Sequence, residues 1–221
     1  MSTTTTDAVQ PDLAAVKQRQ QQTWASADYA AVAARIVPMA EGLAQNAGLR
    51  AGDRVLDVAT GSGNAALAAA RCGCEVTGID YVPALLERAR ARAAAEGLEV
   101  EFAEGDAEHL AFPDASFDAV LSCLGVMFTP DQERAAAELV RVCKPGGTIG
   151  LVNWTPAGFI GQLLRTVGKH VPPPAGVRPP PQWGTEEPRG APRRRGVAAR
   201  HPAAHLRVPV PLPRRLRDLL P

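Results

Sequence analysis

Short apolar segments alternate with segments of helical periodicity through the middle of the chain, and this alternation restricts the fold more than any other feature. The expected strands are RVLDVA from Arg54, a short apolar run that suits a buried strand, then EVTGID from Glu75, EVEFAEGD from Glu99, FDAVLSC from Phe117 and PGGTIGLVNW from Pro145. Segments with helical spacing or helix boundary signals lie at 64–71, 83–97, 131–143 and 158–170. This order predicts an α/β fold with a doubly wound, mostly parallel sheet.

Composition agrees with one domain of ordinary size. The chain has 221 residues, of which 46% are hydrophobic and 21% charged, and its formal net charge is +1. We therefore expect no general attraction to nucleic acid. No apolar run approaches the roughly 20 residues of a membrane helix, and the polar start MSTTTTDAVQP has no hydrophobic signal core. We expect a cytoplasmic protein with no membrane partner. The four cysteines match no zinc or CxxC pattern, so we expect reduced thiols and no metal site.

In a parallel sheet, ligands bind at the carboxyl ends of the strands, so polar residues just after each strand are the candidate site. The first group is Asp57 with Gly61, Gly63 and Asn64 in DVATGSGN. Two glycines allow a tight turn and close approach of a ligand. A phosphate-binding P-loop is excluded because no Gly-Lys-Ser/Thr follows. A dinucleotide site remains open, since Ala66 completes GxGxxA, and so does an ordinary strand-to-helix turn.

Two further carboxylates follow the next two strands. Asp80 ends EVTGID, where a carboxylate can accept hydrogen bonds from both ribose hydroxyls, or can cap the helix that starts at Pro83. Asp106, in EGDAEHL, can accept from an adenine amino group or cap a short helix. A nicotinamide dinucleotide site does not usually require an acid at that third position. Ser122 and Cys123 then end the fourth apolar run.

Taken together, VLDVATGSGN, GID, GDAEHLAFPDASFD and KPGG make the chain resemble class I S-adenosylmethionine-dependent methyltransferases. The similarity is to the type 11 group, which includes quinone-biosynthesis enzymes that act on small molecules. It extends from about Lys17 to Trp183 and is strongest from Val55 to Gly147. The resemblance implies a Rossmann-like sheet, normally of seven strands. It also implies S-adenosyl-L-methionine as cofactor and methyl transfer to a small, apolar or aromatic acceptor.

The resemblance also implies roles for individual residues. Asp57 and the glycine loop would face the methionine part of the cofactor, Asp80 the ribose, and Tyr81 the adenine ring. Asp106 and the Ala107 N–H would contact the adenine edge, and Ser122 and Cys123 the methionyl chain. The cofactor-binding residues expected are Asp57, Ala59, Gly61, Gly63, Asn64, Asp80, Tyr81, Asp106, Ala107 and Ser122. At Ala59 the family commonly has glycine, and we expect a slight shift of the loop without loss of binding.

No catalytic residue is assigned. A general base is needed only if the acceptor must lose a proton. We interpret His109 and His170 as surface histidines, and we expect Trp154 to pack against the sheet rather than line an acceptor pocket. Two alternatives to methyl transfer stay open: a truncated, non-catalytic remnant that binds the cofactor, and an NAD(P)-dependent oxidoreductase. No oligomeric state follows from the sequence.

We divide the chain into five parts. These are a disordered tail (1–15), a helical lid that includes Trp24 and Tyr29 (16–50), a cofactor domain (51–155), a partial substrate-side segment (156–187) and a disordered Pro/Arg-rich tail (188–221). We expect Pro38 to interrupt the second lid helix near Val37.

The last part departs from the rest, because residues 188–221 contain nine arginines and one acid, whereas residues 1–187 carry a net charge of −7. A nucleic-acid-binding tail and a linker are possible interpretations, but we favour a reading-frame slip near Glu187. The C-terminal strand pair and part of the acceptor pocket would then be missing.

Overall fold

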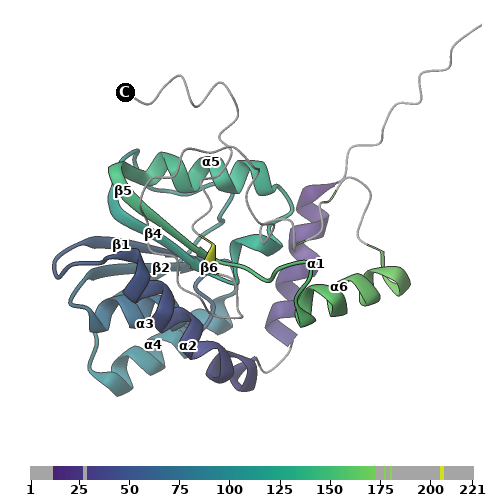
Figure 1. Ribbon diagram of the computed structural model, residues 1–221, viewed down its shortest axis with the longest axis horizontal. Helices are drawn as coiled ribbons and strands as arrows, with labels where there is room; N and C mark the ends of the chain where they lie inside the picture. The colour runs from purple at the N-terminus through teal and green to yellow at the C-terminus, as the bar shows by residue number, and fades with distance from the viewer. Residues whose placement is uncertain (1–11, 27–28, 173–176, 178–179, 181–204, 207–221) are drawn as a thin grey trace, which may run out of the picture.

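The computed structural model describes residues 12–26, 29–172, 177, 180, 205 and 206. Figure 1 shows the elements in chain order. They are α1 (Leu13–Ser26), α2 (Ala30–Ala47), β1 (Arg54–Val58), α3 (Asn64–Arg71), β2 (Glu75–Asp80), α4 (Pro83–Glu96), β3 (Val100–Glu104), β4 (Phe117–Cys123), the short 3-10 helix η1 (Val126–Phe128), α5 (Gln132–Val142), β5 (Cys143–Val152), α6 (Phe159–His170) and β6 (His205–Leu206).

The strands form one sheet in the order β3-β2-β1-β4-β5-β6, in which the first five are parallel. This confirms the predicted α/β, doubly wound, Rossmann-like fold. Strand order reverses beside β1, so the crevice at its carboxyl end is where a ligand is expected in such a sheet.

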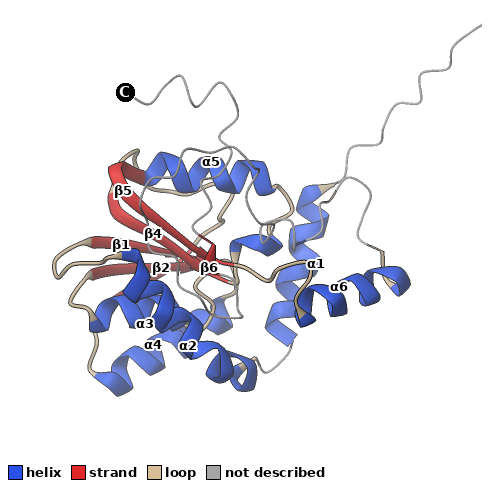
Figure 2. Ribbon diagram, viewed as in Figure 1, coloured by secondary structure: helices blue, strands red, loops and turns tan. Residues whose placement is uncertain are grey.

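Helices cover both faces of the sheet, as Figure 2 shows with α5 on one side and α2, α3 and α4 on the other. Side chains of β1 alternate between the two faces: Val55 packs with α2, α3 and α4, and Leu56 packs with α5. Both are fully buried. Strands buried on both faces explain the continuous apolar runs in the sequence.

Most predicted boundaries agree with the structure to within one or two residues, but the prediction for Pro38 is wrong. Helix α2 runs through Pro38 to Ala47, although proline removes one helical hydrogen bond and costs roughly 3 kcal/mol. The residues after Pro38 explain why. Ala40, Leu43 and Ala47 are buried and belong to the core cluster beneath the sheet, so their packing offsets the cost of the proline.

At the N-terminal end, helix α1 begins at Leu13, and residues 1–11 of the expected tail lie outside the described part. Of the tail 188–221, only residues 205 and 206 are described. They form β6, which pairs antiparallel with Leu151 and Val152 of β5. We expect no strand there from sequence, so this two-residue strand is a departure.

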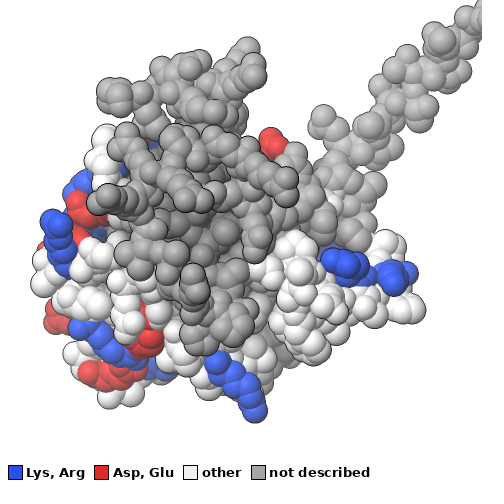
Figure 3. Space-filling view, viewed as in Figure 1, with Lys and Arg blue, Asp and Glu red and all other residues white. Residues whose placement is uncertain are grey.

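The described surface carries charges of both signs. On the face shown in Figure 3, Lys and Arg lie among Asp and Glu at one side of the molecule. Helix α6 exposes several apolar side chains, including Phe159, of which 79% is accessible. None of the helices in the described part of the chain combines the length and apolar character needed to cross a membrane.

Candidate functional site

A cavity of about 240 Å³ lies at the carboxyl ends of the strands, between the sheet and helices α1 and α2. Residues after β1, β2 and β3 meet here, so the three predicted carboxylates surround one space. Eight of the ten predicted cofactor residues line it: Asp57, Ala59, Gly61, Asn64, Asp80, Tyr81, Asp106 and Ala107.

The structure does not place Gly63 and Ser122 in the lining. Gly63 precedes α3 with φ of +87°, and a Cβ there would lie 3.1 Å from the Cβ of Ala89, so the glycine serves packing against α4. The Ser122 hydroxyl is fully buried; it donates to the Val58 carbonyl at 2.7 Å and accepts from the Val126 N–H at 3.1 Å. Their predicted cofactor contacts stay predictions.

Asp57 is the most unusual ionisable group of the cavity. Its Oδ2 accepts from the Thr60 hydroxyl at 2.6 Å and from the Ala66 N–H at 2.9 Å. Its Oδ1 is buried and has no hydrogen-bond partner. Burial raises the pKa of Asp57 to about 7, against the two hydrogen bonds that lower it. A buried carboxylate oxygen without a partner, at the wall of a cavity, suits a ligand that donates hydrogen bonds and carries positive charge.

The loop after β1 bends sharply under the cavity. Ala59 and Gly61 both have φ of +55°, a region that is costly for alanine and free for glycine. This conformation suits the glycine that the resemblance implies at the position of Ala59. The loop after β1 also packs tightly against Gly125, because a Cβ on Gly125 would lie 2.6 Å from both the Cβ and the carbonyl oxygen of Ala59.

Asp80 ties the end of β2 to this loop. Its Oδ2 accepts from the Gly61 N–H at 2.8 Å and its Oδ1 from the Val82 N–H at 2.9 Å. Burial raises the pKa of Asp80, while these backbone hydrogen bonds lower it. A backbone hydrogen bond from Tyr81 also lowers the pKa of Asp80. Because an ionised carboxylate offers about four acceptor positions, Asp80 retains capacity for a ligand hydroxyl.

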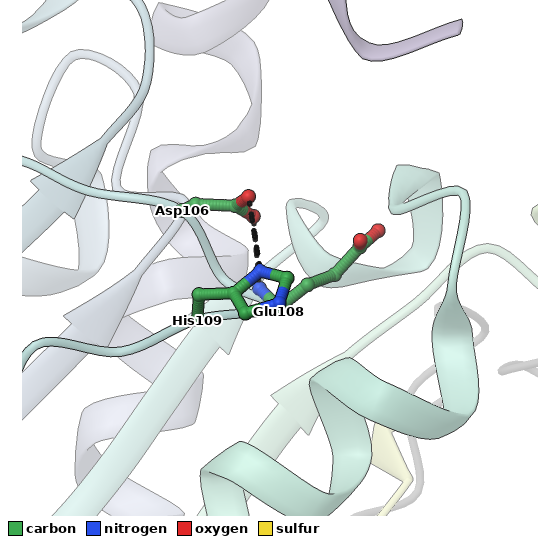
Figure 4. Close-up of side chains that lie close together, drawn as sticks. All are labelled: Asp106, Glu108 and His109. Atoms are coloured by element: carbon green, nitrogen blue, oxygen red, sulfur yellow. Dashed lines mark hydrogen bonds and ion pairs between the residues drawn. The ribbon is translucent and has the colours of Figure 1, made fainter. Parts of the chain in front are cut away.

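Asp106 belongs to a charged group that also contains Glu108 and Lys17 of α1. The Lys17 Nζ lies 2.6 Å from Asp106 Oδ2 and 2.5 Å from Glu108 Oε2. Figure 4 shows the acids together with His109, whose Nδ1 lies 3.5 Å from Asp106 Oδ2. The three side chains are close enough to share a cation, but the Lys17 ammonium already bridges the two acids and offsets one of their two negative charges, and we assign no metal to them. Burial opposes ionisation of Asp106, but its bonds to Lys17 and to the Glu108 N–H hold its pKa below the usual value.

The other side of the cavity is apolar and aromatic. Trp24 lies at the centre, with its ring centroid 5.0 Å from that of Tyr29 and 5.1 Å from that of Phe128. Burial raises the pKa of Tyr81, which also lines this wall. The expectation that Trp154 only packs against the sheet is wrong, because Trp154 lines the cavity. It stands just beyond β5, whose carboxyl end opens onto the site.

Among the residues that line the cavity, all of them described, none is a histidine. The side chain of His109 is 65% exposed, and His170 is exposed at the end of α6. Cys123 lines the cavity, but burial raises its pKa to about 12, so its thiol stays protonated at neutral pH. The described lining of the cavity therefore holds neither a histidine nor an ionised thiol, and no catalytic residue is assigned.

Sequence reasoning missed three site residues. Thr60 lies inside the quoted loop and binds Asp57, Glu108 lies inside EGDAEHL, and Lys17 lies in the first helix. Position alone could have indicated the first two. No local signal marks Lys17, because its partners are about 90 residues away in the chain, and only the tertiary structure joins them.

Comparisons with known proteins agree with this geometry. The family described as "Methyltransferase domain" matches residues 56–151. An uncharacterized protein of Mycobacterium tuberculosis is 51% identical over 168 residues, which cover 75% of this chain and 61% of the relative. The demethylmenaquinone methyltransferase of Deinococcus radiodurans is 42% identical over 128 residues, covering 56% of this chain and 53% of that enzyme. This chain thus spans about half to three fifths of these relatives.

Among solved structures, the YcgJ protein of Bacillus subtilis superposes with a TM-score of 0.52 at 34% identity, covering 59% of this chain and 56% of that one. Together with the family match and the strand order, this shows that residues 56–151 belong to the methyltransferase domain family and have the Rossmann-like core of class I methyltransferases.

Proposed function

We propose that the chain binds S-adenosyl-L-methionine in the cavity at the carboxyl edge of the sheet and transfers its methyl group to a small, apolar or aromatic acceptor. The single observation that carries this proposal is the buried, unpartnered Oδ1 of Asp57, a residue of the cavity lining. The cofactor's α-ammonium group supplies the charge and the donors that this oxygen lacks.

The contacts of Asp57 also argue against a dinucleotide. In nicotinamide enzymes of this architecture, the pyrophosphate sits at the N-terminus of the helix after the glycine loop. Here that position is taken by the protein, since Asp57 Oδ2 accepts from the N–H of Ala66, in the first turn of α3. A phosphate at the same place would meet a carboxylate.

The charge of the cavity supports the same choice. The charged residues in its lining are four acids, Asp57, Asp80, Asp106 and Glu108, and one cation, Lys17. Such a wall attracts a sulfonium and an ammonium group and repels a pyrophosphate. The oxidoreductase alternative is therefore disfavoured by both contacts and charge.

When bound, the cofactor supplies a methyl group already activated on positively charged sulfur, so the chain's own work is positioning and exclusion of water. Asp57 would hold the ammonium, Asp80 the ribose hydroxyls, and Asp106 with the Ala107 N–H the adenine edge. Trp24, Phe128 and Trp154 would form an apolar wall for the acceptor and keep water out. The name of the Deinococcus relative is compatible with an acceptor of this class.

Calorimetric titration tests the cofactor assignment. The full chain is titrated with S-adenosylhomocysteine and, in parallel, with NAD⁺. We expect one-to-one binding of S-adenosylhomocysteine and no heat of binding with NAD⁺. Equal or tighter binding of NAD⁺ would contradict the proposal.

A turnover assay separates the enzyme from a remnant. It follows S-adenosylhomocysteine formation from S-adenosylmethionine in the presence of a panel of quinols, phenols and amines. Methyl transfer to any of them supports the enzyme, whereas binding without turnover across the panel supports the non-catalytic alternative.

A further inference from the structure

Helix α1 contacts the rim of the cavity with one face. Lys17, Gln20, Gln21 and Trp24 follow the spacing i, i+3, i+4, i+7 and therefore point the same way. The Gln20 amide donates to the Phe128 carbonyl at 2.9 Å, and the Gln21 amide to the Tyr81 carbonyl. Trp24 packs against Phe128. These contacts join α1 to segments that follow β2, β3 and β4.

This face is mostly polar. The one buried residue within α1 is Val16, so hydrophobic burial holds this helix less strongly than it holds α2, whose second half lies in the core. The position of α1 therefore depends on a small number of directional contacts. The strongest of these by charge is the pair of bonds made by Lys17.

The two acids that receive Lys17 are themselves fixed. Glu108 is only 2% exposed, and its Oε1 accepts from the Asp131 N–H at 2.8 Å, which leaves Oε2 for Lys17. Asp106 uses Oδ1 to accept from the Glu108 N–H at 2.9 Å and Oδ2 to bind Lys17. Both carboxylates are thus held in place by hydrogen bonds from backbone N–H groups. Removal of the Lys17 ammonium would leave the buried Glu108 carboxylate without its counter-ion.

We propose that Lys17 is the positioning residue that holds α1 closed over the cavity, by bridging Asp106 and Glu108, and that it thereby slows release of the ligand. The part that concerns the ligand rests on the proposed function. Asp106 links the position of α1 to ligand binding, because it binds Lys17 of α1 and also lines the part of the cavity where the adenine edge is expected. Loss of Lys17 frees α1 and shifts Asp106.

Lys144 provides a matched control. Its Nζ lies 2.7 Å from Asp118 Oδ1, with side-chain exposures of 39% and 35%, against 23% and 35% for Lys17 and Asp106. Asp118 is the second residue of β4, at the end of the sheet away from the cavity. Lys17→Met and Lys144→Met each remove one ammonium from one ion-paired site and keep an unbranched apolar side chain. Lys17→Arg keeps the charge.

The first experiment is hydrogen–deuterium exchange on the full-length, ligand-free chain. We expect Lys17→Met to speed exchange in residues 13–26 about tenfold or more and to leave β1, β2 and β4 unchanged, whereas Lys144→Met leaves residues 13–26 unchanged. Unchanged exchange of α1 in Lys17→Met, or equal loosening of α1 in both variants, would overturn the proposal.

The second experiment measures the dissociation rate of S-adenosylhomocysteine by stopped-flow tryptophan fluorescence. We expect a rate about tenfold faster in Lys17→Met, near the unaltered rate in Lys17→Arg, and unchanged in Lys144→Met. A dissociation rate that does not respond to Lys17→Met contradicts the link to ligand release. If the unaltered chain binds no S-adenosylhomocysteine, the proposed function fails, and the exchange experiment alone decides whether Lys17 holds α1.

Discussion

Replacing Asp57 by asparagine should make the protein more stable and less able to bind its ligand. Burial raises the pKa of Asp57 from 3.8 to about 7 in the folded protein. In the unfolded chain the group ionises near its ordinary value, so between pH 4 and 7 the folded state binds the extra proton. The contribution of Asp57 to stability therefore falls as pH rises through this window, and it reaches its least favourable value above pH 7.

The magnitude follows from the size of the shift. About three pKa units at roughly 1.4 kcal/mol each give about 4 kcal/mol lost at pH 8 relative to pH 4. The asparagine side chain keeps an oxygen that can accept from Thr60 and Ala66, as Asp57 Oδ2 does now, but carries no charge. Asp57→Asn should therefore raise the free energy of unfolding by up to about 4 kcal/mol at pH 8 and by little near pH 4.

Urea unfolding at several pH values measures this difference, with Asp53→Asn as a control for loss of one acid near the start of β1. Calorimetry on the same variants should show that Asp57→Asn binds S-adenosylhomocysteine at least tenfold more weakly, because the amide cannot pair with an ammonium. Equal stability of Asp57→Asn and the unaltered chain at pH 8, or a gap that does not shrink on acidification, would refute the reasoning.

Three further substitutions test the loop and the second carboxylate. Asp80→Ala should weaken S-adenosylhomocysteine binding about ten- to a hundredfold, since it removes a charged acceptor for the ribose and a partner of the Gly61 N–H; unchanged affinity in calorimetry argues against the ribose assignment. Ala59→Gly should raise stability by about 0.5–1 kcal/mol by relieving the positive φ, and a loss of stability in urea unfolding contradicts this. Gly125→Ala should lower the free energy of unfolding by about 2 kcal/mol, because the new Cβ would lie 2.6 Å from Ala59. A melting temperature equal to that of the unaltered chain would contradict this.

Much of the fold could be predicted because local and tertiary preferences agree in it. The buried parallel strands are continuous apolar runs, and helix α4 has proline at its start and glycine at its end. Pro38 is the opposite case. Its local preference breaks a helix, but burial of Leu43 and Ala47 beyond it keeps the helix intact, and no local pattern reports that burial.

The residues of the site likewise include some that could be predicted from the sequence and some that could not. Asp57, Asp80 and Asp106 could be found from sequence because each lies at or just beyond the carboxyl end of a strand, and parallel topology brings these ends together. Lys17 could not, because its pairing with Asp106 and Glu108 depends on where α1 docks. Ser122 follows the pattern of a site residue but points its hydroxyl at the Val58 carbonyl. Sequence position locates a residue at the edge of the sheet, and only the structure decides which side its side chain takes.

A crystal structure of the full chain with S-adenosylhomocysteine tests the central claim most directly. We predict the ligand's ammonium group within hydrogen-bond distance of Asp57 Oδ1, its ribose hydroxyls on Asp80, and Lys17 still bridging Asp106 and Glu108. A ligand bound elsewhere, or one seated in the cavity with Asp57 Oδ1 still without a partner, would contradict the account.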